Sequence, residues 1–286
     1  MNGRSEDRAA SAAAIARCFV TARQSAKSLA KFPGTIPQDL DTAYLCQELA
    51  IKAWPDRLIG WKVGMIAPPL RPIFKADRLA GAIFEAGLRN AGELRSPGEL
   101  RNAGEQVEFP VFVGGFAAVE AEFVLRIAHD APAGKLDWSE REAQALVSGM
   151  HIGIETAGSP LATINELGPT AIAADFGNNA GLILGPEVHD WTAQPLDSLR
   201  VVTSIDAQLV GRGDAGFLLH GPIGALQFLA AQAAKMGRPL RAGMLVSTGA
   251  LTGVHDISVG QSAVADFGAL GRISCFAVAA AACRKH

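Results

Sequence analysis

The chain has 286 residues, a formal net charge of −2 at pH 7 and a hydrophobic content of 49%. These values are typical of one large or two small globular domains, and the balanced charge gives no support for nucleic-acid binding. No uncharged apolar run reaches the roughly 18–20 residues that a membrane span requires, so no membrane partner is expected. The early acidic residues Glu6 and Asp7 argue against a transit peptide, and the four cysteines show no CxxC pairing. Reduced thiols and a cytoplasmic location are therefore expected.

The N-terminal part of the sequence predicts helices. Residues 8–31 are rich in alanine with spaced apolar side chains, and DTAYLCQELAIKAW predicts a second helix capped by Asp39 or Asp41. From there on the sequence changes to short apolar runs interrupted by glycine, proline and asparagine. We therefore expect an N-terminal helical segment over 1–57 that packs on a catalytic core over 58–286, within a single domain.

The core region predicts mostly strands. Two helices interrupt them: WSEREAQALVSGM, which Ser139 and Glu142 open with a capping box, and GPIGALQFLAAQAAKMG, which Gly237 and Pro239 close. Because strands and helices do not alternate regularly, the fold class is expected to be α+β, and a doubly wound sheet is disfavoured. The strand candidates are IGWKVGM, VFVGGFAAVEAEFVLRIA, AGLILG, SLRVVTSIDAQLV, AGMLVSTGA and ISCFAVAAAA.

A short tandem repeat occupies residues 88–105, with the units LRNAGE, LRSPGE and LRNAGE. Three six-residue units cannot bury a core, so we expect a surface insertion, either a solvated hairpin or a loop, with no catalytic role.

Three glutamates stand in strongly apolar surroundings. In VEAEFVLRI the alternation typical of a strand puts Glu120 and Glu122 on one face, roughly 6–7 Å apart. Two such carboxylates repel each other and resist desolvation, so either that face is open to water or a cation neutralises it. Glu155, in the equally apolar MHIGIETAG, favours the cation. A set of carboxylate oxygens suits a hard ion such as Mg²⁺ or Mn²⁺.

Lys62 lies in the apolar run IGWKVGM. Two interpretations stay open: the lysine lies on an edge strand and extends its ammonium group into solvent, or it is buried beside a partner. A buried lysine near the carboxylates would serve as an acid/base group or as an anion contact.

Two polar loops could line a pocket. ADFGNNAGLILG holds Asp175, Asn178 and Asn179, and ordinary turn chemistry explains these residues as well as a binding role does. VSTGALTG is either a glycine-rich hairpin or a loop whose amides and hydroxyls bind a ligand carboxylate.

Taken in order, GWKVGM, VEAEFVLRI, HIGIETAGS, ADFGNNAGLILG, LVSTGALTG and ADFGALG resemble the 2-keto-4-pentenoate hydratase and 4-oxalocrotonate decarboxylase family. That family is part of the fumarylacetoacetate hydrolase superfamily, and the resemblance extends over roughly residues 40–280. It implies a mixed β-roll with N-terminal and flanking helices. It also implies a lyase that acts on small 2-oxo or 2-hydroxydienoic acids from aromatic ring cleavage. Such a lyase adds water to its substrate, or decarboxylates it, through an enolate that a metal stabilises. The apolar composition further indicates a homo-oligomer.

The resemblance also implies the roles of single residues. Glu120, Glu122 and Glu155 would hold Mg²⁺ or Mn²⁺, and Lys62 would be the catalytic residue. The residues implied to bind substrate are Ser247, Thr248, Gly249, Asp175 and Asn178.

The sequence departs from the family pattern at one informative position. The hydratases carry an aspartate in a DEPDFG-like segment, where this chain has Leu79, and Asp77 is two residues away. Hydration by that route therefore lacks its usual carboxylate. Hydration still ranks narrowly ahead of decarboxylation, and a weakly active protein that binds metal and organic acid is the further alternative. The C–C hydrolases of the superfamily use an early histidine, whereas the first histidine here is His129, so hydrolysis is disfavoured.

Overall fold

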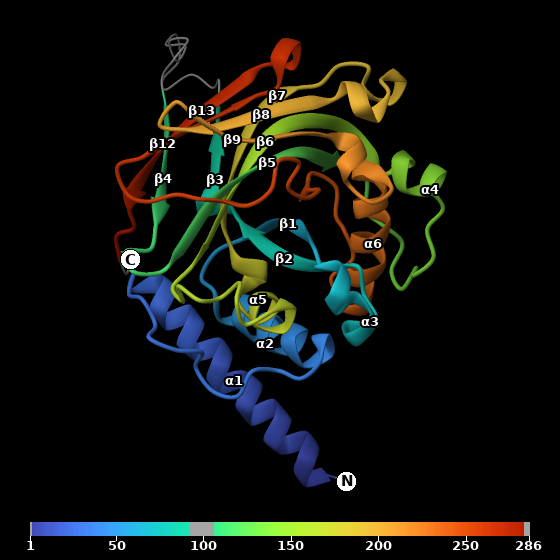
Figure 1. Ribbon diagram of the computed structural model, residues 1–286. Helices are drawn as coiled ribbons and strands as arrows, with labels where there is room; N and C mark the ends of the chain where they lie inside the picture. Colours follow the sequence, from blue (N-terminus) through green and yellow to red (C-terminus); the bar gives the residue numbers. More distant parts are fainter. Residues whose placement is uncertain (1, 92–105, 283–286) are drawn as a thin grey trace.

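The structure is a computed structural model that describes residues 2–91 and 106–282. Two curved β-sheets form the body of the molecule, and the N-terminal helices lie beneath them (Figure 1). The α+β fold with rolled sheets that the sequence predicts is confirmed. None of the described helices combines the length and apolar character that crossing a bilayer requires.

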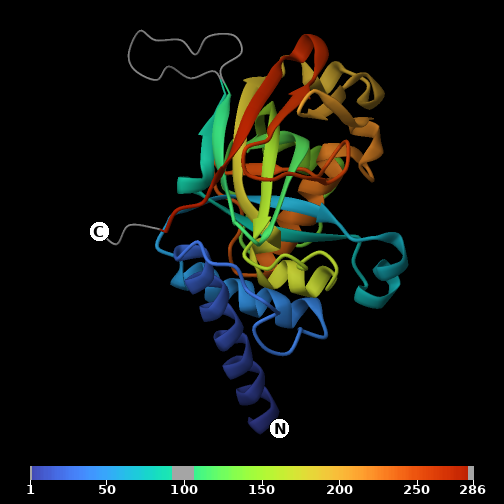
Figure 2. The same ribbon diagram turned by 60° about the vertical axis from the view of Figure 1, so that its left-hand side comes forward.

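The first two helices are α1 (Asn2–Gln24) and α2 (Leu40–Ala53). Asp39, one of the two predicted caps, is the N-cap of α2 and accepts a hydrogen bond of 2.7 Å from the Thr42 amide. The second half of α1 packs on the body of the protein, whereas its first turns extend away from it (Figure 2). Buried Phe19 of α1 makes an edge-to-face contact with Phe32, with the ring centroids 5.6 Å apart. The division of the chain at residue 58 stays a prediction.

Among the described residues, the larger sheet has eight strands, in the order β2-β1-β10-β5-β6-β7-β3 with β11 paired to β5. It is mixed, because β1 pairs with β10, and β3 with β7, in parallel. Its strands are β1 (Leu58–Met65), β2 (Arg78–Phe84), β3 (Leu88–Asn90), β5 (Phe116–Ile127), β6 (Val147–Ser159), β7 (Asn179–Glu187), β10 (Leu245–Ser247) and β11 (His255–Asp256).

The smaller sheet covers one side of the larger one (Figure 1). Its described strands follow the order β4-β13-β12-β8-β9. The run SLRVVTSIDAQLV, expected as one strand, instead contains β8 and the start of β9, which form a hairpin. They are β4 (Val107–Val111), β8 (Arg200–Ile205), β9 (Gln208–Asp214), β12 (Ser262–Asp266) and β13 (Arg272–Ala279).

The other helices are α3 (Arg71–Phe74), α4 (Glu140–Ala145), α5 (Pro169–Ala174) and α6 (Gly221–Lys235). The capping box of α4 is present as predicted, but the helix expected over WSEREAQALVSGM is wrong beyond Ala145. From Val147 the chain forms β6, which pairs with β5 along nearly its whole length. The long ladder of interstrand hydrogen bonds outweighs the local helical preference of this segment.

Only the start of the predicted repeat insertion lies within the described residues. Leu88–Asn90 forms β3, which pairs with β7. The rest, residues 92–105, lies outside the described residues.

The long antiparallel pair β5 and β6 is the centre of the larger sheet. Its register puts Glu120 directly opposite Glu155, and Glu122 opposite Gly153. On the other side β10 pairs with β5 at residues 124–126, and the loop after β10 donates backbone hydrogen bonds to the β5 carbonyls of Phe123 and Ala121, next to the glutamates. β7 borders β6.

A close backbone contact brings a polar turn to the same region. The turn η3 (Phe176–Asn178) crosses β2 at Gly81, where an added Cβ would lie 2.1 Å from the Phe176 carbonyl oxygen. Gly81 pairs with Lys62 of β1, so the missing side chain lets η3 lie next to that lysine.

We predict that Gly81→Ala destabilises the protein by about 1–3 kcal/mol, because the methyl group must displace the backbone of η3. Chemical denaturation measures the change in the free energy of unfolding. An unchanged value would show that the contact at Gly81 is not tight.

Candidate metal centre

The three predicted glutamates converge in the fold. One carboxylate oxygen from each of Glu120, Glu122 and Glu155 lies within 4.8 Å of the other two. Glu120 is 4% exposed, and Glu122 and Glu155 are fully buried. The alternative of a face open to water is therefore excluded.

The oxygens of this group fit a hard cation. Glu122 Oε1 and Glu155 Oε2 are buried and accept no hydrogen bond within the described part of the chain. Glu155 Oε2 forms an ion pair with Lys62, whereas Glu122 Oε1 accepts no hydrogen bond from any described residue. A buried carboxylate oxygen without a hydrogen bond is costly, and a divalent ion with a preference for oxygen ligands would satisfy both atoms.

The raised pKa values of two of these glutamates also indicate a site for a cation. Burial raises the pKa of Glu120 to about 7, although the Lys62 ammonium opposes the shift. Burial, with the charges of the other two glutamates, raises the pKa of Glu122 well above its ordinary value. Without a cation Glu120 and Glu122 therefore resist ionisation, and a bound cation would reverse that tendency.

Lys62 is buried beside the glutamates. β1 lies between β2 and β10, so the interpretation as an edge strand is wrong. Its Nζ lies 3.3 Å from Glu155 Oε2 and 3.4 Å from Asn178 Oδ1. Burial lowers the pKa of Lys62, but the three glutamates, Glu155 foremost, outweigh it and raise the pKa above its ordinary value. Lys62 is therefore held as an ammonium group.

The loop after β10 holds Glu122 in place. The Ser247 hydroxyl and the Gly249 amide donate hydrogen bonds of 2.5 and 2.8 Å to Glu122 Oε2. The Thr248 hydroxyl donates instead to the Phe123 carbonyl, at 2.8 Å. These contacts fix one oxygen of Glu122 and leave the other free toward the neighbouring glutamates.

Two neighbouring asparagines contact Glu155 and Lys62: Asn178, the last residue of η3, and Asn179, the first residue of β7. Asn179 Nδ2 donates a 3.0 Å hydrogen bond to Glu155 Oε1, and Asn178 Nδ2 donates a 2.8 Å bond to Asn165 Oδ1. Asn178 thereby turns its oxygen to Lys62. Of the two interpretations left open for this loop, ordinary turn chemistry or a pocket lining, the position of Asn179 against Glu155 favours the second.

Asp175 contacts a different partner. Its Oδ1 accepts a 2.6 Å hydrogen bond from Arg23 Nε of α1, and its Oδ2 accepts one of 2.6 Å from the Ser159 hydroxyl. No described contact joins Asp175 to the glutamates. No local sequence pattern marks Arg23 as a functional residue, because its partner Asp175 is 152 residues away.

The position of the missing aspartate is apolar in the structure. Leu79 is 3% exposed. A Cβ added to Gly64 would lie 3.5 Å from Leu79 Cδ1 and 3.4 Å from Lys62 Nζ, so the leucine borders the space next to the ammonium group. Asp77 does not replace the acid, since its side chain is 57% exposed and lies 3.8 Å from Arg71 Nε.

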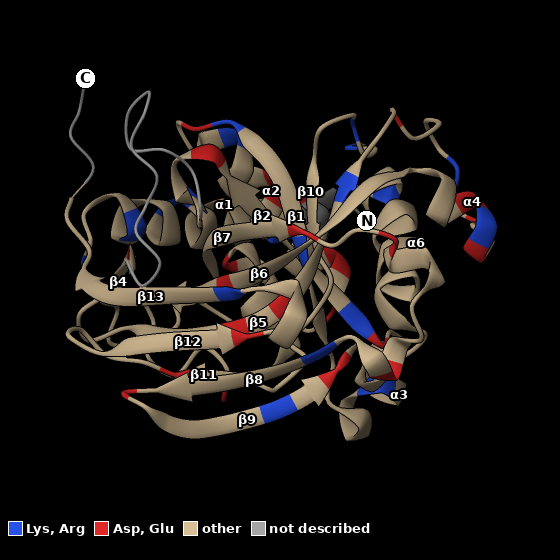
Figure 3. Ribbon diagram, turned by 90° about the horizontal axis from the view of Figure 1, so that it is seen from above, with Lys and Arg blue, Asp and Glu red and all other residues tan. Residues whose placement is uncertain are grey.

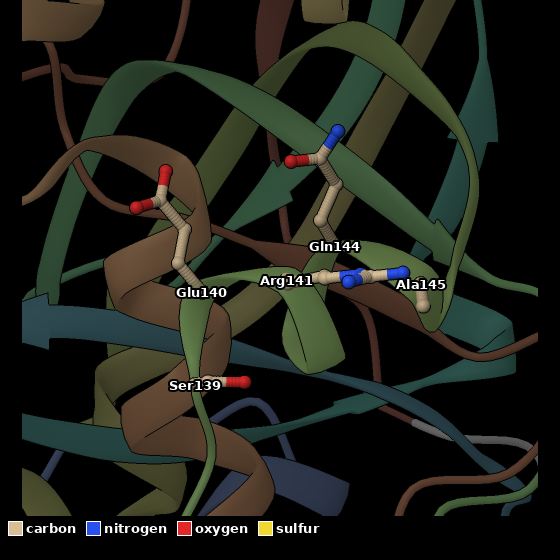
Figure 4. Close-up of a pocket in the computed structure, with 5 residues that line it drawn as sticks. All are labelled: Ser139, Glu140, Arg141, Gln144 and Ala145. Atoms are coloured by element: carbon tan, nitrogen blue, oxygen red, sulfur yellow. The ribbon is translucent and has the colours of Figure 1, made fainter.

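One hollow on the surface of the described chain lies apart from the three glutamates. This open hollow of about 620 Å³ lies at α4, where Figure 4 shows the lining side chains; none of the three glutamates takes part. Basic and acidic residues are interspersed over the described chain (Figure 3), and the formal net charge is only −2.

Comparison with known proteins identifies the class. The family model described as fumarylacetoacetate (FAA) hydrolase C-terminal matches residues 94–276. The chain therefore belongs to the fumarylacetoacetate hydrolase family, and the resemblance noted in the sequence is confirmed.

Individual relatives define its neighbourhood more closely. The chain is 24% identical over 270 residues to the 2-keto-4-pentenoate hydratase of Burkholderia vietnamiensis (strain G4 / LMG 22486), covering 92% of this chain and 96% of the relative. The solved structure of 4-oxalocrotonate decarboxylase from Pseudomonas putida G7, complexed with magnesium and adipate, has a TM-score of 0.74 and 18% identity, covering 97% of this chain and 99% of that chain. Fumarylpyruvate hydrolase from Pseudomonas aeruginosa, in complex with Mn²⁺ and pyruvate, has a TM-score of 0.53 and 18% identity, covering 79% and 91%. At these identities the structural matches show the shared fold.

We predict that Glu122→Gln weakens the binding of Mg²⁺ or Mn²⁺ by more than about 100-fold and leaves the fold intact. The amide keeps the size of the side chain and an acceptor oxygen for the Gly249 amide. Calorimetric titration measures the affinity, and exposed Glu108→Gln is the control. Equal affinity in Glu122→Gln and the parent would remove Glu122 from the ligands.

We predict that the metal-free protein loses stability as the pH rises from 4.5 to about 7. The unfolded chain releases the Glu120 proton near the ordinary pKa of 4.5, whereas the folded chain keeps it to about 7, so the proton stabilises the folded state only below this window. A cation that displaces this proton should raise the melting temperature more at the upper end of the window than at the lower end.

Thermal unfolding with and without Mg²⁺ at both ends of the window tests this. Glu120→Gln should weaken the pH dependence without abolishing it, because Glu122 keeps a raised pKa. A larger stabilisation by Mg²⁺ at the acid end would contradict the prediction.

Proposed function

We propose that this protein is a metal-dependent lyase that acts on a short 2-oxo or 2-hydroxydienoic acid. One observation carries the proposal: three buried glutamates, two of which have an oxygen that accepts no hydrogen bond in the described chain, surround a point beside a buried ammonium group. The named activities of the relatives, a hydratase and a decarboxylase, support it.

Glu120, Glu122 and Glu155 would hold Mg²⁺ or Mn²⁺. When bound, such an ion supplies Lewis-acid polarisation of the carboxylate and carbonyl oxygens of a 2-oxo acid. The Mg²⁺ and Mn²⁺ complexes of the two solved relatives, which also contain the small acids adipate and pyruvate, support both the ion and the substrate class.

Lys62 is the residue that moves a proton in this proposal. Its Nζ carries a proton within 3.3 Å of Glu155 and borders the space next to Gly64 and Leu79. It can deliver that proton to the substrate carbon, or hold the substrate carboxylate by charge. Ser247 and Gly249 orient Glu122 and Asn178 orients Lys62, so these residues serve the reaction by position. Substrate contacts of Ser247, Thr248, Gly249, Asp175 and Asn178 stay predictions.

Hydration and decarboxylation remain the two candidate reactions, and Leu79 favours decarboxylation. Hydration needs a group that takes a proton from water, and a leucine side chain cannot do so. In decarboxylation the substrate carries a second carboxyl group, conjugated with the 2-oxo group or β to it, and the bond to that carboxyl carbon breaks as CO₂ leaves. The electron pair moves toward the 2-oxo group, and the carbon that lost CO₂ then gains a proton. An apolar wall favours the loss of a charged carboxylate, since it solvates that charge poorly.

A screen of 2-oxo acids with added Mg²⁺ or Mn²⁺ tests the proposal, with CO₂ release and the loss of dienoate absorbance followed in parallel. Release of CO₂ identifies a decarboxylase, and dienoate loss without CO₂ identifies a hydratase. Turnover at background with every acid would favour a protein that only binds metal and organic acid. Self-association and a cytoplasmic location stay predictions; sedimentation tests the first.

We predict that Lys62→Ala lowers turnover by about 100- to 10,000-fold while divalent-ion binding is retained, because Lys62 donates protons and contributes no ligand oxygen. Turnover and calorimetric affinity are measured side by side. Lys52→Ala on α2 is the control, since its side chain is 64% exposed. Normal turnover of Lys62→Ala would remove Lys62 from the mechanism.

A further inference from the structure

Arg23 is a buried arginine that joins the N-terminal helix to the sheet beside the glutamates. Its side chain is 5% exposed, and its charge is paired with Asp175 at 2.6 Å. Its guanidinium carbon also lies 5.2 Å from the centroid of the Phe176 ring and 5.6 Å from that of Phe112. A buried arginine with this many partners is held in one geometry.

The remaining hydrogen bonds of Arg23 go to backbone carbonyls. Nη1 donates to Asn179 O at 2.8 Å, and Nη2 donates to Asp175 O at 3.2 Å and to Gly158 O at 2.9 Å. The carbonyls of residues 175 and 179 are the two ends of a short turn. The planar guanidinium therefore closes this turn from outside.

The turn between these two carbonyls has an unusual backbone. Phe176, Gly177 and Asn178 all have positive φ, at 53°, 63° and 53°. Residues other than glycine adopt this left-handed backbone conformation only at an energetic cost. Such a conformation persists only where the surrounding structure holds the backbone in place. Arg23 supplies contacts at both ends, and Gly81 supplies the space underneath.

The same turn carries two side chains of the candidate metal centre. Asn179, whose carbonyl Arg23 holds, donates through its side chain to Glu155 at 3.0 Å. Asn178 lies 3.4 Å from the Lys62 ammonium through its Oδ1. A shift of the turn would therefore move Asn179, the partner of the proposed ligand Glu155, together with Asn178, the partner of Lys62.

We propose that Arg23 is a positioning residue of the metal centre: by clamping the turn over 175–179, it orients Asn179 on Glu155 and Asn178 on Lys62. Through this clamp one side chain of helix α1, and not the packing of the helix as a whole, orients these two asparagines. The inference rests on the proposed function, because it assumes that the glutamates bind a divalent ion.

Arg23→Lys tests this role, with Mn²⁺ as the probe. A lysine keeps the charge opposite Asp175 but lacks the planar fork that holds both carbonyls. Electron paramagnetic resonance of free Mn²⁺ gives the affinity, and we expect the dissociation constant to rise about 10-fold or more, the range typical of outer-shell partners of a metal. Turnover on the substrate found by the screen should fall along with it.

Phe19→Leu is the matched control. It loosens the packing of α1 at the contact with Phe32 and touches no hydrogen bond of Arg23. It should lower the melting temperature and keep the Mn²⁺ affinity of the parent protein. If Phe19→Leu loses as much Mn²⁺ affinity as Arg23→Lys for the same loss of melting temperature, Arg23 only docks the helix and the proposal is wrong.

Unchanged Mn²⁺ affinity in folded Arg23→Lys would also overturn the proposal, and it would leave the proposed function untouched. If Arg23→Lys does not fold, Asp175→Asn replaces it: loss of Mn²⁺ affinity supports the clamp, and parent affinity overturns it. A parent protein that binds no Mn²⁺ overturns the proposed function and this role with it.

Discussion

The constraint on which this structure depends is the burial of three carboxylates around one point. Glu120, Glu122 and Glu155 lie in the centre of the larger sheet, where water cannot screen their mutual repulsion. If all three are ionised, the single positive charge of Lys62 leaves a formal charge of −2, because −3 and +1 sum to −2. One divalent cation cancels that charge. The alternative is protonation, toward which burial drives Glu120 and Glu122.

Hydrogen bonds from neighbouring segments hold these carboxylates in place. The loop after β10 donates to one oxygen of Glu122, and Asn179 donates to one oxygen of Glu155. In each carboxylate the other oxygen accepts no hydrogen bond in the described chain, although that of Glu155 forms an ion pair with Lys62. One oxygen of each carboxylate is therefore held by donors, and the other is open to the proposed cation. This division is typical of metal sites whose outer partners fix the orientation of the ligands.

The fold and the reaction are determined by different parts of the chain. The family includes relatives named as a hydratase and a decarboxylase, and solved neighbours of the same fold include a hydrolase. The shared fold therefore does not choose between these reactions. Under the proposed function the choice would depend on the side chains beside Lys62, where Leu79 makes the surroundings apolar.

The sequence by itself determined the features that depend on local periodicity. Alternation along a strand is a local property, so it placed Glu120 and Glu122 on one face, and the capping box at Ser139 followed from its own four residues. The residues that carry the resemblance also gave the family, and with it the fold class.

The tertiary structure decided what depends on distant partners. Whether Lys62 was exposed or buried depended on β10, which adds a strand beside β1 from far along the chain. The end of the helix after Ser139 depended on β5, whose ladder makes Val147 the start of a strand. The position of Glu155 opposite Glu120 followed from the β5–β6 register, and the partner of Asp175 lay on α1. Periodicity and capping act over a few residues, whereas burial, register and ion pairing form only when distant segments meet, so the second group could not be predicted from local pattern.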